Sequence, residues 1–129
     1  MKKEIYIVIL IIILIITGHI CTQIYTKNFF DNISVQLDNI MGKIINDNSE
    51  LSDLESEIQG VEDKWNEKYD LLAYYIEHDE LEKVKTQLIS AKANIKIKDY
   101  DKCYEELEKC KFVLEHIKDK DSLKLVNIF

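Results

Sequence analysis

The chain has 129 residues, and its 24 acidic side chains against 17 lysines give a net charge of −7. This length allows one small domain. Three glycines and no proline exclude a Gly-rich phosphate-binding loop, because the closest pair is Gly42 and Gly60. They also argue against a β-sandwich or barrel, whose many turns use Gly and Pro. The sequence names no reaction or ligand, but it does predict an architecture.

The N-terminal segment is predicted to be a transmembrane anchor. Residues 5–16 form an unbroken apolar run, and no charged residue follows until Lys27. A helix needs roughly 20 residues to cross a ~30 Å hydrocarbon core, and residues 5–25 supply that length after a stub at 1–4. Two alternatives are a cleaved secretory signal and a helix lying in the membrane interface. Only residues 16–18 (ITG) resemble a cleavage site, so we expect an uncleaved anchor.

The charges around this segment predict its direction. Lys2 and Lys3 precede it, whereas Lys27 is followed closely by Asp31. The positive-inside bias then places the N-terminus in the cytoplasm and the rest of the chain outside a cell membrane. Residues 28–129 contain fourteen lysines against twenty-three acidic residues. Such a charge repels nucleic acids and anionic headgroups, so nucleic-acid binding is not expected.

Apolar residues then recur at three- and four-residue steps, which is typical of amphipathic helices. We expect helices at about 26–46, 50–78, 80–97 and 100–118. A capping box at 52–55 (SDLE), with Ser49 as the alternative start, and an acidic cap at 79–82 (DELE) would open the second and third helices. The predicted core anchors are Trp65, Leu72, Leu88, Leu107 and Leu114.

The predicted fold class is therefore all-α, with a transmembrane helix followed by an antiparallel four-helix up-down bundle at 26–121. The alternative is a pair of long helical hairpins that associate only in an oligomer.

Up-down connectivity brings the turn near His78, together with His116, to the membrane-proximal end. Either Tyr74 or Tyr75 should be exposed there. The apolar tail at 122–129 is expected to fold back over this end; lying on lipid or inserting into a partner are the alternatives.

Sequence motifs for chemistry are absent. There is no H-E-x-x-H or C-x-x-C pattern, so no catalytic residue, cofactor or metal is expected and enzyme activity is not predicted. His78 and His116 are the candidates for a metal, but we expect each to close a helix C-terminus. Cys103 and Cys110 are seven residues apart on one helix, too far for a disulfide with each other. Cys21 lies at the outer edge of the anchor.

The order of these pieces resembles a known family. An N-terminal anchor is followed by a helix carrying Trp65, then by residues 76–81 (IEHDEL), 114–117 (LEHI) and 125–129 (LVNIF). This arrangement is similar to the small, N-terminally anchored Bacillota proteins grouped as domain of unknown function 4363. The family has no assigned activity, cofactor or catalytic residue, so the resemblance implies none. It does imply a bacterial single-pass membrane protein. Its recurring motifs fall at the end that the up-down topology places beside the membrane.

These observations favour a non-catalytic accessory or scaffolding subunit that docks to another membrane protein, or to a second copy of itself, through its membrane-proximal end. One alternative is an extracytoplasmic ligand-sensing bundle acting through a partner, with a pocket near Trp65 and Tyr69. Another is a metal-dependent hydrolase at His78 and His116. The candidate docking residues are Tyr75, His78, Asp79, Glu80, His116, Asn127, Ile128 and Phe129.

Overall fold

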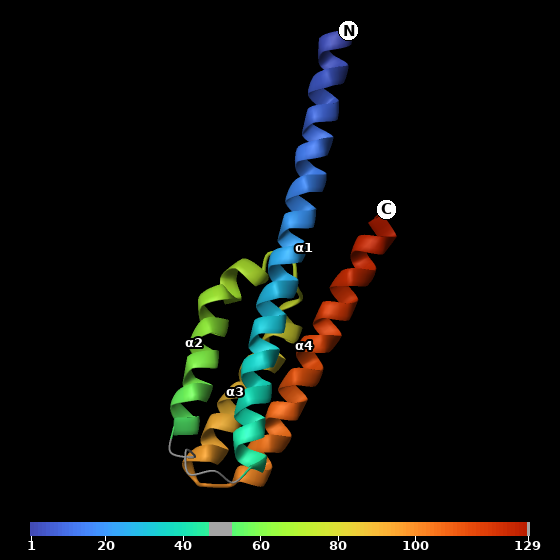
Figure 1. Ribbon diagram of the computed structural model, residues 1–129. Helices are drawn as coiled ribbons and strands as arrows, with labels where there is room; N and C mark the ends of the chain where they lie inside the picture. The colour runs from blue at the N-terminus through green and yellow to red at the C-terminus, as the bar shows by residue number, and fades with distance from the viewer. Residues whose placement is uncertain (47–52, 129) are drawn as a thin grey trace.

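The computed structural model describes residues 1–46 and 53–128, with side chains through residue 120, and these residues are helical apart from short turns (Figure 1). Four helices form in the described ranges: α1 (Lys2–Ile45), α2 (Leu54–Leu72), α3 (His78–Lys96) and α4 (Tyr100–Ile128). The predicted fold class, all-α with one long apolar N-terminal helix and a helical bundle, is confirmed.

α1 is one uninterrupted helix with two differently surrounded parts. Residues 2–25, here called the stem, project from the bundle and expose most of their apolar side chains (Figure 1). Neither a proline nor a break in helical backbone separates the stem from the rest of α1. At about 1.5 Å per residue, α1 is roughly 66 Å long. Below the stem, α1 buries Thr26, Phe30, Ile33, Ser34, Leu37, Ile40 and Met41.

The bundle is closed in sequence order. α1 packs against α2, α2 against α3, α3 against α4, and α4 back against α1. Neighbouring helices are antiparallel (Figure 1), so each turns its one apolar stripe inward, as an up-down bundle requires. The stripe of α3 is Leu81, Val84, Leu88, Ala91 and Ile95, and that of α4 includes Cys103, Leu107, Cys110, Leu114 and Ile117.

Trp65 joins three of the helices within this core. Its side chain is fully buried, and its indole N–H donates to the Leu81 carbonyl of α3 at 3.3 Å. The ring stacks on Phe29 of α1 at 6.0 Å between centroids and lies 5.7 Å from Phe30. A buried indole therefore has both its hydrogen bond and aromatic neighbours. The other expected anchors, Leu72, Leu88, Leu107 and Leu114, are also buried.

The connection between α2 and α3 begins earlier than expected. α2 ends at Leu72 rather than 78, and the N–H groups of residues 73–76 cap carbonyls of its last turn. Ile76 is then buried after the helix has ended. α3 starts at His78 with Glu77 in the N-cap position, so the predicted cap at Asp79 was wrong.

At the other end of α2 the N-cap residue is Asp53, which makes no side-chain cap bond. The predicted cap residues Ser49 and Ser52 lie outside the described residues.

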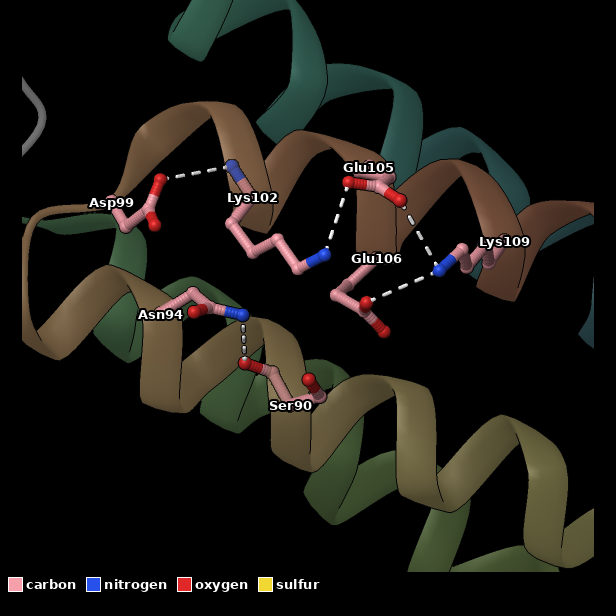
Figure 2. Close-up of polar contacts among 7 residues, drawn as sticks. All are labelled: Ser90, Asn94, Asp99, Lys102, Glu105, Glu106 and Lys109. Carbon is pink, nitrogen blue, oxygen red and sulfur yellow. Dashed lines mark hydrogen bonds and ion pairs between the residues drawn. The ribbon is translucent and has the colours of Figure 1, made fainter.

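The turn between α3 and α4 lies at the end of the bundle farthest from the stem, which we call the far end (Figure 1). Lys98 has a left-handed backbone with φ 61°, which costs a non-glycine residue about 1 kcal/mol. Asp99 accepts a hydrogen bond from the Lys102 N–H at 3.1 Å and so caps α4. Figure 2 shows the ion pairs that follow along α4: Lys102 pairs with Glu105, and Lys109 pairs with both Glu105 and Glu106.

The C-terminal tail continues α4. The helix runs without a break to Ile128, so it does not fold back over the bundle end as expected (Figure 1). Residues 119–128 contain neither glycine nor proline, and nothing in that stretch stops a helix. His116 is therefore inside α4 rather than at its C-terminus.

Candidate functional site

The bundle end from which the stem projects, here called the stem end, contains the residues singled out by the sequence. His78, Asp79 and Glu80 form the first turn of α3, and His116 of α4 lies close to Glu80. Carboxylates in a first helical turn are stabilised by the positive end of the helix dipole, which is a structural reason for Asp79 and Glu80. His78 starts α3, so its expected role of closing a helix C-terminus was wrong.

His78 belongs to a small polar cluster with Tyr69 and Glu82. The Tyr69 hydroxyl donates to Glu82 Oε1 at 2.6 Å and lies 2.9 Å from His78 Nδ1. Because the single hydroxyl proton goes to Glu82, the histidine nitrogen is the donor in the second contact. Desolvation and the neighbouring Glu82 carboxylate raise the pKa of Tyr69 to about 12. This cluster fixes the orientation of the exposed imidazole.

Glu80 and Glu77 connect the start of α3 to α4. The Glu80 carboxylate is largely buried and lies 3.9 Å from His116 Nε2. Glu77 accepts a hydrogen bond from Lys120 at 2.9 Å. The sequence pattern identified Glu80 and His116 but missed Lys120, because a single lysine on a charged helix face carries no signal in a sequence. Asp79 remains exposed beside these pairs.

Tyr75, one of the expected docking residues, contacts α1. Its hydroxyl is hydrogen-bonded to that of Thr26 on α1, and Thr26 in turn donates to the Thr22 carbonyl at 2.8 Å. Tyr75 is therefore the donor and is partly buried. Thr26 was not predicted, since threonine inside a helical stripe has no recognisable pattern. Tyr74, by contrast, is 87% exposed, which confirms that one of the two tyrosines faces outward.

The structure does not bring the two histidines into one site. His78 contacts Tyr69 and Glu82, whereas His116 contacts Glu80. Among the described residues, no group of three or more His, Cys, Asp or Glu side chains is placed to hold a metal ion. Asn127 and Ile128 lie on the α4 backbone beyond the described side chains, and Phe129 lies outside the described residues.

A shallow groove opens between α1 and α2, at the seam where these helices make fewer contacts than the other neighbouring pairs. Its volume is about 390 Å³, within the range of small-molecule pockets. Phe29 forms part of its wall and stacks on the buried Trp65. The groove therefore lies one aromatic ring away from Trp65. Its lining residues are Tyr25, Asn28, Phe29, Asn32, Lys64, Glu67 and Lys68.

The two bundle cysteines are expected to be unreactive. Cys103 and Cys110 are fully buried in the stripe of α4. Desolvation raises the pKa of each thiol to about 12, so the reactive thiolate is scarce near neutral pH. Cys21, on the stem, is exposed.

These features define a class of protein: one apolar helix, long enough to cross a membrane and with none of its most apolar window buried, that continues into an up-down helical bundle. A family model described as "Domain of unknown function (DUF4363)" matches residues 20–128. The chain belongs to this family, and the predicted resemblance is confirmed. No curated protein and no solved structure matches the chain.

Proposed function

We propose that this protein is a single-pass membrane protein whose bundle is a non-catalytic accessory module docking to another membrane protein through its stem end. The observation that carries the proposal is the continuity of α1. Its exposed apolar stem and its buried lower part are one helix, Lys2–Ile45. No hinge separates them, so a bilayer that held the stem would also hold the bundle in one orientation.

The direction across the membrane follows from charge. Lys2 and Lys3 precede the apolar run, and the acidic bundle follows it. The positive-inside bias favours a cytoplasmic N-terminus and an extracytoplasmic bundle. An acidic bundle held just outside the membrane would meet basic surfaces of a partner that projects from the same bilayer.

The docking surface would be the charged side of the stem end, formed by α3 and α4. His78 and Asp79 are exposed, and Tyr69 and Glu82 hold the imidazole in place. Polar groups already held in one rotamer lose less entropy on binding than free ones. Support for a non-catalytic role comes from Cys103 and Cys110, whose buried thiols are kept protonated and away from solvent.

A photo-crosslinking amino acid in place of Asp79 would test this docking in intact cells. We expect a defined higher-mass adduct with a membrane protein, and no such adduct from the same probe at Ile97, which is also exposed but lies in the far-end turn. The adduct should weaken when His78 and Glu77, both exposed, are replaced by Lys, because the docking surface then becomes less acidic. Recovery of monomer alone from the Asp79 probe, or equal adducts at both sites, would contradict docking through the stem end.

A second candidate, ligand sensing, is supported by the groove between α1 and α2. A ligand bound there would displace or press on Phe29 and thereby change the surroundings of Trp65, the one tryptophan of the chain. The expected result is a shift of tryptophan emission on adding a ligand, lost in Asn32→Leu. Emission that stays constant across a panel of amino acids, sugars and small anions would remove this candidate.

A further inference from the structure

We propose that the α1–α2 side of the stem end rests on the lipid headgroup layer through a collar of Tyr25, Leu71, Tyr74 and Lys68. The inference rests on the proposed membrane anchoring by the stem, and it names a second surface of the same end. The charged α3–α4 side then remains for a protein partner.

The height of the collar is set by contacts within the bundle. The hydrogen bond between Tyr75 and Thr26 holds the α2–α3 connection against α1 at the base of the stem (Figure 1). Residues 5–24 of the stem contain no acidic residue or lysine and would span about 30 Å as a helix. That length matches the hydrocarbon core. Thr26, and with it the neighbouring turn, would therefore lie at the level where hydrocarbon gives way to headgroups.

The exposed side chains at this level are those that membranes accept there. Tyr74 lies in the turn and Leu71 just before it, and both are exposed; Tyr25 is exposed at the last position of the stem. Tyrosine is enriched at the membrane–water boundary because its ring is apolar and its hydroxyl binds water or phosphate. The Tyr74 side chain is 87% exposed, so the bundle itself covers little of its ring. A lipid surface would cover these apolar groups.

Lys68 connects the two helices within the collar. Its ammonium lies 5.6 Å from the centroid of the Tyr25 ring, across the seam between α2 and α1. Leu71 follows three residues later on α2, and so on the same helix face. Tyr25, Lys68 and Leu71 are thus neighbours on one side of the stem end, and Tyr74 follows Leu71 in the adjoining turn, where its backbone N–H donates to the Leu71 carbonyl at 3.3 Å. The ammonium of a lysine at this height can reach lipid phosphates while its methylene chain covers apolar surface.

Spin labelling in phosphatidylcholine vesicles would test the collar. Nitroxide labels are placed by Tyr74→Cys, Ile97→Cys or Ile13→Cys in a Cys21→Ser background; the buried Cys103 and Cys110 stay unlabelled. Ile97 is the aqueous control, because its side chain is 72% exposed and lies at the far end. Ile13 reports the membrane interior. Blue-shifted Trp65 emission shows that each variant keeps its core.

We expect the label at residue 74 to collide severalfold less with a water-soluble nickel complex than the label at 97, and severalfold more with oxygen. Equal values at 74 and 97, with residue 13 in hydrocarbon, would overturn the collar and leave the anchoring intact. Low collision with both reagents at 74 would mean protein rather than lipid covers it, which also overturns the collar. If residue 13 is as accessible to nickel as 97, the anchoring fails and the collar with it.

Discussion

The two parts of α1 share one backbone conformation and have opposite surroundings. In the stem, residues 5–16 are apolar around the whole circumference of the helix. Most of these side chains are exposed. Residues 26–45 place apolar residues on one stripe and bury them in the bundle. The difference teaches that helix formation is local, whereas burial depends on the period of the apolar residues. A helix that is apolar on all sides cannot be covered by three neighbours on one side.

The thiols give the largest expected contrast, because Cys21 belongs to the stem and the other two belong to the bundle. The pKa of Cys103 and Cys110 is raised from 9.0 to about 12. Their thiolate fraction should then fall on the order of a thousandfold relative to the unfolded chain. Maleimide labelling rates in detergent, with and without urea, followed by mass spectrometry, measure this. Cys21, as the internal control, should label at a rate that urea leaves nearly unchanged. Bundle thiols that react within tenfold of their unfolded rate would contradict their burial.

Two leucines of the same helix offer a matched pair. Leu37 is fully buried and Leu14 is 62% exposed. Leu37→Ala should lower the free energy of unfolding of the bundle by about 2–5 kcal/mol, since it removes buried methyl groups and leaves a cavity. Leu14→Ala should leave it unchanged within about 0.5 kcal/mol. Urea unfolding in micelles, followed by circular dichroism and Trp65 emission, measures both. Similar losses from the two substitutions would mean that the stem also stabilises the bundle.

The glycines allow a smaller test in the opposite direction. A Cβ built at Gly60 of α2 or at Gly18 of the stem meets no atom within 4 Å, and both residues have ordinary helical backbone. Gly60→Ala should therefore stabilise the bundle by about 0.5–1 kcal/mol through the lower entropy of the unfolded chain. Gly18→Ala should not change bundle unfolding. The same urea titration applies, and destabilisation by Gly60→Ala would show that the α1–α2 seam needs a residue without a side chain.

The smallest effect concerns pH. Hydrogen bonds from Lys111 to Asp38 and from Lys118 to Asp31 join α4 to the lower part of α1 and raise the pKa of both lysines. A raised folded-state pKa gives stability that is present below the ordinary lysine pKa and lost as pH rises through the folded value. Each pair contributes a few tenths of a kcal/mol.

Unfolding midpoints between about pH 9 and pH 12 should fall more steeply for the parent chain than for a Lys111→Met, Lys118→Met double variant. Lys102→Met, which removes a bridge within α4 alone, is the control and should keep the parent slope. Identical slopes for parent and double variant would mean that these two pairs add nothing to the α1–α4 contact.

Most of the architecture could be predicted from residue periodicity. The apolar period predicted the amphipathic helices, and Trp65, Leu88 and Leu107 were recognised as core anchors. Helix ends were harder. α2 ends at Leu72 because residues 73–76 cap its carbonyls and Ile76 is buried after it, which depends on α1 and α3 rather than on local sequence. α4 continues through the tail because no residue there stops it.

The candidate site shows the same division. Connectivity alone placed His78 and His116 at one end, but it could not tell that they contact different carboxylates or that Tyr75 is bonded to Thr26. Such pairs join residues up to 49 positions apart in the chain. A periodic pattern records which side of a helix faces inward. It does not record which residue of another helix lies opposite at the same height.

The amino-acid sequence by itself determined the helical class, the apolar N-terminal segment, the core stripes and the family, because each of these follows from composition, period or motif order along one segment. Only the tertiary structure decided the height of each helix against the next, and hence which side chains meet at the stem end. The physical reason is that helical hydrogen bonds close within four residues, whereas the register between helices is set by side-chain packing and long-range polar pairs.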